Sequence, residues 1–341
     1  MKKSLIALAA LAATASFAQS AVTLYGAMDA GYQSINYKGN SVNGINGNGS
    51  TTSSFNVAGL YDLGGGMKAD FRVENDWNTV SNNANQGANT TLSSSGTDTK
   101  MANGASWGNG EIRTGLAGNF GKVQFGAINN NTLIANLSGQ PFGTAIGSAH
   151  GSLLRSNAAG TAVRNDNSWQ YNTPVFNGFS ASYLASSKQN KAVGANASTA
   201  ASSFTSTLGG YLQQGVSEFS AAYNNGPIDA RFTSLKTDNS PTGGVNYTTN
   251  TLGANYAIGD AKVFLWNQTN KAADGSFNTS GTTVSATYTM GATVLMARAG
   301  SVKRNDTSSY TGQKSTLMAL GADYNLSKTT ALYARYEAAD D

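Results

Sequence analysis

Charged side chains recur at every second position between Met67 and Trp77, and the positions between them are apolar except for Asn75. The charged residues of this stretch are Lys68, Asp70, Arg72, Glu74 and Asp76. Because successive side chains of a β-strand point to opposite faces, the period of two predicts a strand with one charged and one apolar face. Rings of such charges, facing water in a pore, select ions by close-range electrostatics rather than by making bonds.

Residues for bond-making chemistry are scarce. His150 is the only histidine, and it lies in a Gly/Ala/Ser tract beside Ser148 and Ser152. A serine–histidine pair is one route to an activated nucleophile, yet nothing in this tract orients the imidazole. The absence of cysteine excludes thiolate metal sites. A calcium site made of loop oxygens stays open, although no EF-hand spacing occurs. We therefore expect no enzymatic activity and no cofactor.

The first residues predict export. Lys2 and Lys3 precede an apolar run from Leu5 to about Ala15, and Ser16-Phe17-Ala18 fits a small-x-small cleavage site. We expect a signal peptide over 1–18 and a single domain over 19–341. No later stretch has the roughly 18 apolar residues that a transmembrane helix needs. The formal net charge is +4 and the basic residues are scattered, so the sequence does not indicate nucleic-acid binding.

Short turns and long polar tracts alternate along the rest of the chain. Alternating segments of about nine to eleven residues separate them, the first beginning near Val22 and continuing to Gln33. The long tracts lie near 38–53, 78–109, 128–163, 186–214, 237–246, 269–280 and 304–314. Short turns on one side and long loops on the other are typical of a transmembrane antiparallel β-barrel. The fold class is therefore all-β, and a soluble sandwich has no reason to keep its long loops on one edge.

Tyrosines stand just before six of the seven short turns, and Phe120 takes this place at the remaining one. The tyrosines are Tyr61, Tyr171, Tyr223, Tyr256, Tyr288 and Tyr324. An aromatic ring at one height on each hairpin is favoured at a bilayer interface, where the ring is buried and the hydroxyl stays wet. The alternative is that tyrosine is simply common in strands.

Several motifs together resemble the general porins of Gram-negative β-proteobacteria of the Neisseria and Burkholderia type. They include Val22-Thr23-Leu24-Tyr25-Gly26, Asp62-Leu63-Gly64-Gly65-Gly66 and Gly115-Leu116-Ala117-Gly118-Asn119-Phe120-Gly121. Asp166-Asn167-Ser168 and Leu326-Ser327-Lys328 add to the likeness. The resemblance implies a homotrimer of outer-membrane barrels with about sixteen strands, each a passive water-filled channel for small hydrophilic solutes and ions. It also implies that the third loop, 128–163 here, folds into the lumen and narrows it.

The candidate pore residues combine the strand pattern with this resemblance. On the inward parity we place Lys68, Asp70, Arg72, Glu74, Glu111, Arg113 and Lys122, together with Asp29, Asp229, Arg231 and Lys262. The third loop would bring His150, Arg155 and Arg164 to the narrowest point. Alternatively, the paired charges only brace the barrel wall.

Selectivity is expected to be weak. Gln140-Pro141-Phe142-Gly143 is similar to the Pro-Glu-Phe-Gly element of porin constriction loops, but the acid is missing. Ser54, Ala58, Tyr61 and Ala127 also stand where the family often has charged residues. We expect discrimination mainly by size, with a slight lean to anions from Arg72, Arg113 and Arg155.

About fifteen strand segments are present, so the first and last would run in the same direction. Two such strands cannot close an antiparallel barrel, and an open edge in lipid is prohibitive. We therefore expect that a last loop and strand are missing after Asp341. A surface adhesin or receptor barrel without conductance is the main alternative function, and a barrel hydrolase using His150 is a third.

Overall fold

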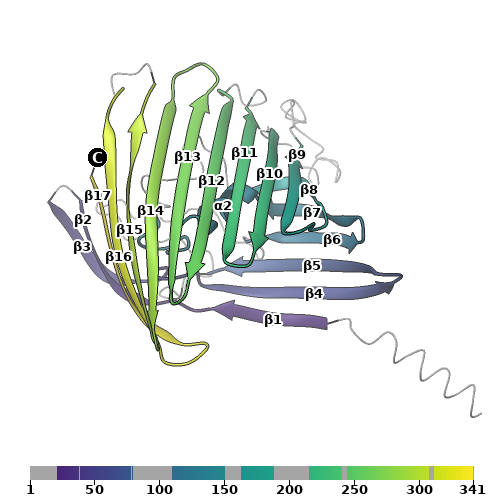
Figure 1. The fold of residues 1–341 in the computed structure, drawn as a ribbon, viewed down its shortest axis with the longest axis horizontal. Helices are drawn as coiled ribbons and strands as arrows, with labels where there is room; N and C mark the ends of the chain where they lie inside the picture. The colour runs from purple at the N-terminus through teal and green to yellow at the C-terminus, as the bar shows by residue number, and fades with distance from the viewer. Residues whose placement is uncertain are drawn as a thin grey trace, which may run out of the picture.

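The computed structural model describes residues 21–37, 39–77, 79, 110–149, 163–187, 215–239, 244–306 and 311–340. These residues form a fifteen-stranded antiparallel sheet, a separate two-stranded hairpin and a helix that lies against the concave face of the sheet (Figure 1). The expected signal peptide, 1–18, lies outside the described residues. Among the described residues, no helix is long and apolar enough to span a bilayer.

The strands of the large sheet follow one another in chain order, except that β1 pairs directly with β4. Their bounds are β1 (Ala21–Ala27), β4 (Ser54–Gly64), β5 (Met67–Asp76), β6 (Ile112–Gly118), β7 (Gly121–Asn129), β8 (Arg164–Asn172), β9 (Phe179–Ser186), β10 (Gly215–Asn225), β11 (Ile228–Asp238), β12 (Tyr247–Ile258), β13 (Ala261–Ala272), β14 (Asn278–Met290), β15 (Thr293–Arg304), β16 (Lys314–Asn325) and β17 (Ala331–Asp340). The predicted all-β fold and its fifteen sheet strands are confirmed.

The connections alternate as the sequence predicts. Two residues join β4 to β5, where Gly65 and Gly66 both have positive φ, a conformation that glycine adopts without steric cost. The other short turns, such as those from β12 to β13 and from β14 to β15, lie at the same end of the strands. The other connections lie at the opposite end and are mostly long, but the tract expected near 269–280 is largely strand, and only 273–277 join β13 to β14. A barrel of this kind exposes its long loops to the outside of the cell.

The register defines which side chains share the inner face. Facing partners lie on the same face of a sheet, and one row of partners crosses six strands from β5 to β10. The row is Asp70, Gly115, Gln124, Gln170, Leu184 and Glu218. Glu218, the last member of this row, binds the helix on the concave side of the sheet. The face of β5 that carries Asp70 and the other charges therefore points to the interior, as predicted.

The outer face is apolar and carries aromatic rings near the short turns. On that face of β4 and β5, Tyr61 stacks on Phe71 with ring centroids 6.3 Å apart. Tyr256, Tyr288 and Tyr324 occupy the corresponding places on later hairpins and are exposed. These positions match those expected for an aromatic belt.

The first segment differs from its prediction. A continuous strand from Val22 to Gln33 was expected, but β1 ends at Ala27. The chain then forms a hairpin of β2 (Gly31–Tyr37) and β3 (Asn40–Asn46), of which only β3 lies inside the expected loop, 38–53. Asp29 causes the break. Its carboxylate accepts hydrogen bonds of 2.7 Å from the backbone N–H groups of Ser50 and Thr51. Asp29 is therefore buried in this corner rather than lining the lumen.

The two outermost strands of the described sheet are β1 and β17, and the antiparallel order makes them run in the same direction. Side chains of β17 reach the chain that follows β1. The Tyr333 hydroxyl donates to Asp29 at 2.6 Å, and the Arg335 guanidinium donates to the Ser50 hydroxyl at 3.1 Å. These contacts attach the segment between β1 and β4 to β17.

Candidate functional site

A short helix, α2 (Asn131–Ser138), begins the described part of the third loop. Asn130 caps its N-terminus, and its side-chain oxygen accepts the N–H of Leu133 at 2.9 Å. The helix packs mainly against β11 and β12, inside the curve of the sheet. The described part of the loop therefore folds into the lumen, as predicted, although the helix itself was not predicted in this Asn/Ser/Gly-rich tract.

Glu218 on β10 binds the first turn of α2. Its carboxylate accepts the N–H groups of Asn131 and Thr132 at 2.5 and 2.6 Å, and the Thr132 hydroxyl at 2.7 Å. These N–H groups have no partner within the helix, and the helix dipole favours a negative charge at this end. The Asn131 side chain also accepts a hydrogen bond of 3.0 Å from Arg231 on the inner face of β11. One buried carboxylate thus positions the start of the loop.

Replacing Glu218 by Gln is expected to loosen this attachment. The amide offers one acceptor oxygen where the carboxylate has two, and its NH₂ group would face an N–H donor. Hydrogen bonds to charged groups contribute about 1.5–3 kcal/mol each, so the loss should lower the denaturation midpoint and expose the loop to protease. Ser217→Ala, on the opposite face of the same strand, is the control. Equal proteolysis of Glu218→Gln and the wild type would contradict this role.

The middle of α2 lies directly on β12. A Cβ atom built on Gly253 would come within 1.7 Å of the backbone oxygen of Ala135, so only glycine fits beneath the helix. Gly139, which follows the helix, has similarly little room, since its Cβ would lie 2.9 Å from the Cβ of Trp266. Two glycines thus allow the loop backbone to contact the wall.

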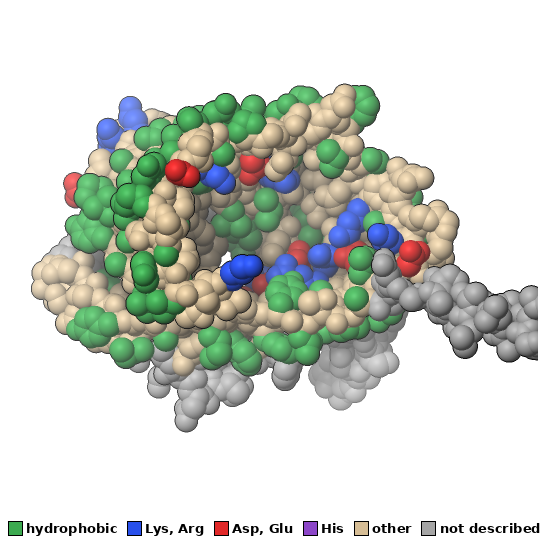
Figure 2. Space-filling view, turned by 60° about the horizontal axis from the view of Figure 1, so that its bottom comes forward, with side chains coloured by type: hydrophobic (Ala, Val, Ile, Leu, Met, Phe, Trp, Pro, Cys, Tyr) green, Lys and Arg blue, Asp and Glu red, His purple; other side chains and the backbone are tan. Residues whose placement is uncertain are grey.

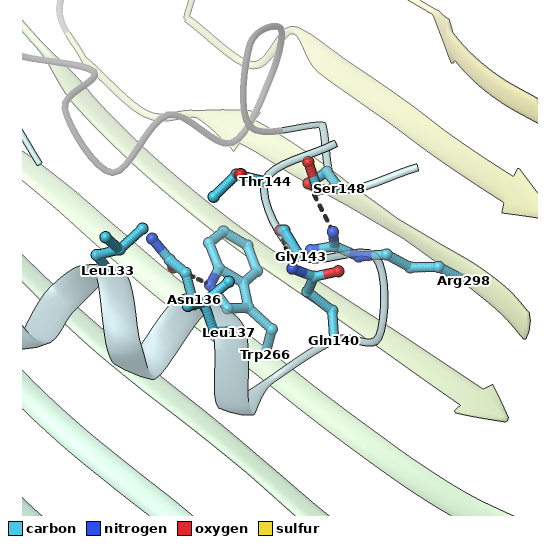
Figure 3. A pocket seen from close by; sticks show the side chains of 9 residues that line it. All are labelled: Leu133, Asn136, Leu137, Gln140, Gly143, Thr144, Ser148, Trp266 and Arg298. Carbon is cyan, nitrogen blue, oxygen red and sulfur yellow. Dashed lines mark hydrogen bonds between the residues drawn. The ribbon is translucent and has the colours of Figure 1, made fainter. Parts of the chain in front are cut away.

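Side chains from β13 and β15 complete the attachment (Figure 3). The indole N–H of Trp266 donates to Asn136 at 2.5 Å, and Arg298 donates to the backbone oxygen of Ser148 at 2.6 Å. A cavity of about 10 Å³ remains between loop and wall. This is close to the least volume that holds one water molecule, so the loop is tightly packed.

The remainder of the described loop turns along β15 to β17. The Gln140 side chain closes the turn by bonding Phe142 N–H and Gly143 C=O, both at 2.6 Å, and Phe142 is buried against the wall. The Glu337 carboxylate of β17 accepts the N–H groups of Gly147 and Ala149 at 2.7 and 2.9 Å. Gln140 therefore shapes the turn and does not add a polar group to the pore.

The wall of β5 to β8 carries the mixed charges expected from the sequence (Figure 2 shows such charges inside the hollow, with apolar side chains over the outside). Arg72 bridges Glu74 and Glu111, both at 2.9 Å. Arg113 binds Asp70 and Glu111, the latter at 3.2 Å. The pattern is a continuous network rather than separate pairs.

Two further cations extend this network. The Lys122 ammonium lies 3.1 Å from Asp70, and Arg164 lies 3.4 Å from Asp76 and 3.9 Å from Glu74. Among the described residues, the network of β5 to β8 thus has four basic and four acidic side chains, and their formal charges cancel. Within the described chain, no cluster of three or more His, Asp or Glu side chains is suited to a metal ion.

The two signs are unequally exposed. The side chains of Arg72, Arg113, Lys122 and Arg164 are 19–32% exposed, whereas those of Asp70, Glu74, Asp76 and Glu111 are 9–15% exposed. Every base of the network is more accessible than every acid. The water in the lumen therefore meets cationic groups, with the anionic groups behind them. The described part of the loop, 130–149, has no ionisable side chain.

Of the fourteen candidate pore residues, the structure brings seven together in this network: Asp70, Arg72, Glu74, Glu111, Arg113, Lys122 and Arg164. Lys68 shares the inner face but lies near the short turn, and it makes no ion pair with a described residue. His150 and Arg155 lie outside the described residues, so their place in the constriction stays a prediction. The residues that fix the loop, Glu218, Trp266, Arg298 and Glu337, were not predicted as its anchors, because an isolated polar residue in a strand gives no sign of a distant loop.

Comparison with known proteins agrees with this architecture. A family model for Gram-negative porins matches residues 7–341. The chain is 33% identical to outer membrane porin protein 32 of Delftia acidovorans over 350 residues, covering 98% of this chain and 88% of that protein. It is also 33% identical to the major outer membrane protein P.IB of Neisseria gonorrhoeae over 197 residues, 56% of this chain and 49% of that protein.

Solved structures share the fold. The anion-selective porin from Comamonas acidovorans aligns with a TM-score of 0.69 at 24% identity, covering 93% of this chain and 88% of that one. OmpT of Vibrio cholerae, in its trimer form, aligns with a TM-score of 0.63 at 15% identity, covering 94% and 89%.

Proposed function

The chain belongs to the Gram-negative porin family, and from its pore wall we propose a diffusion channel with weak preference for anions. The protein is an outer-membrane porin, a channel and not an enzyme. Solutes cross it passively through the water-filled lumen.

The unequal exposure of the charges on β5 to β8 supports a preference for anions. A permeating ion meets the guanidinium and ammonium groups first, while the carboxylates behind them reduce the field without cancelling it at close range. Facing this wall, the described part of the loop has only uncharged side chains. We therefore expect discrimination mainly by size, and only a modest preference by charge. The Comamonas relative, which has the same fold, is described as anion-selective.

We propose further that the protein assembles as a homotrimer, as the trimer form of Vibrio cholerae OmpT does. Porin barrels are hydrophobic on the outside, and closed cyclic symmetry is the usual form of a homo-oligomer. Size-exclusion chromatography with light scattering, in detergent, checks this proposal. A purely monomeric, conducting protein would reject it.

Reconstitution in a planar bilayer under a potassium chloride gradient tests the proposed selectivity. We expect stepwise conductance and a small zero-current potential of the sign given by chloride permeation. Graded polyethylene glycols added to both sides should reduce the conductance up to a defined size. A zero-current potential of the potassium sign would reject the preference for anions, and absence of conductance steps would reject the open channel.

A further inference from the structure

Four lysines point outward from β11 to β16, near the ends of the strands that carry the long loops. They are Lys236, Lys271, Lys303 and Lys314. All four are exposed, and none makes an ion pair with a described residue. Elsewhere on the described sheet, on β1 and β4 to β10, the Lys and Arg side chains belong to the inner face. The outward cations are therefore confined to one end of one part of the wall, which we call the lysine row.

The lysine row lies just beyond the apolar band. On β11 the outward side chains run from Phe232 through Ser234 to Lys236, and on β16 they run from Met318 through Thr316 to Lys314. One polar residue thus separates the last large apolar side chain from the cation. Four residues of strand span about 13 Å, and a lysine stem adds reach toward the headgroup region.

Two members of the row face each other directly. Lys303 on β15 and Lys314 on β16 are cross-strand partners in the register. The Cβ atoms of such partners are about 4.5–5.5 Å apart, and like charges at this distance destabilise a sheet. The carboxylates near this level are Asp238 on β11, Asp274 in the connection after β13 and Asp340 on β17. None of them is the register partner of Lys303 or Lys314, and neither lysine makes an ion pair with a described residue.

We propose that the lysine row binds the phosphate groups of anionic lipids in the outer leaflet of the membrane. The long loops mark this end as extracellular, and the lysines lie at the level of the headgroups. A phosphate between Lys303 and Lys314 would compensate two repelling cations at once. Lys236 and Lys271 are the register partners of Thr248 on the two neighbouring strands, and they offer a second position for a phosphate. This lipid site is separate from the pore and independent of its ion preference.

A titration of the full chain in detergent with fluorescent lipid A, a bisphosphorylated glycolipid, tests the proposal. Near a charged surface each lysine contributes about a fivefold change in affinity, so K303Q/K314Q should bind roughly 25-fold more weakly. The control K262Q/K328Q also removes two cations, that of Lys262 on the inner face of β13 and that of Lys328 in the short turn after β16, and should bind as the wild type does. K303R/K314R, which keeps both charges, should restore most of the affinity.

The stability of the lipid-free protein provides a second readout. Because K303Q/K314Q removes a repelling pair, it should unfold without lipid at the same temperature as the wild type or a higher one. Equal loss of lipid binding in the control pair would overturn the proposal. So would unchanged binding of dephosphorylated lipid A, or full competition by millimolar inorganic phosphate, which indicates a site for free anions. Loss of the oligomer in K303Q/K314Q would instead assign the row to a subunit contact.

Discussion

Replacing Gly253 by alanine is expected to widen the pore. The added Cβ would lie 1.7 Å from the backbone oxygen of Ala135, and neither backbone can yield without moving its whole element. Overpacking of this kind costs about 1–3 kcal/mol. We expect the helix α2 to leave the wall, because the loop is held by fewer contacts than the strand. Single-channel conductance should rise, and larger polyethylene glycols should enter the lumen.

Ala254→Val is the matched control for this substitution. Ala254 is the next residue of β12, and its register partners Ala230 and Leu265 place it on the outer face. The extra methyl groups there should leave conductance and the size limit unchanged. If Gly253→Ala folds and conducts with the wild-type size limit, the contact between α2 and β12 does not control the width of the channel.

The double variant R72Q/R113Q is expected to reverse the ion preference. It removes two partly exposed cations and leaves Glu74, Glu111 and Asp70 with weaker compensation. The zero-current potential under a salt gradient should therefore change from the chloride to the potassium sign. E74Q/E111Q removes the opposite charges from the same network and should strengthen the preference for anions.

These two variants also decide between selection and bracing. If the charges only hold the wall, both double variants should lower the unfolding temperature and leave the zero-current potential unchanged. Lys328→Gln, in the short turn after β16, is a control for the general effect of charge, and it should change neither quantity. Opposite shifts of the potential in R72Q/R113Q and E74Q/E111Q would show that the network acts on the permeating ions.

Most of the fold could be predicted from the pattern of alternating strand residues. The alternation from Met67 to Trp77 predicted its two faces because a period of two leaves no freedom once one face meets lipid. The positions of the short turns followed from glycine and from the tyrosines beside them. The break at Asp29 was missed, because the alternating pattern continues through it and the cause is a contact with Ser50 and Thr51.

The site was less predictable than the fold. The charges of β5 to β8 were expected on the inner face, but their unequal exposure depends on how the guanidinium groups cover the carboxylates, which no spacing reveals. The sequence could not identify Glu218 and Glu337 as loop anchors for another reason. Each accepts hydrogen bonds from backbone N–H groups. Because every residue except proline has such a group, the residue types of the loop do not show where a carboxylate binds.

The anchors of the loop have a consequence for the order of folding. Glu218 lies 86 residues along the chain from Thr132, and Glu337 lies 190 residues from Gly147. Contacts between such distant residues form late, since the intervening chain must first be ordered. We expect the barrel wall to assemble before the loop settles on it. A nascent pore would then begin wide and reach its final width only when β17 is in place, so a leaky membrane would be an early sign of incomplete folding.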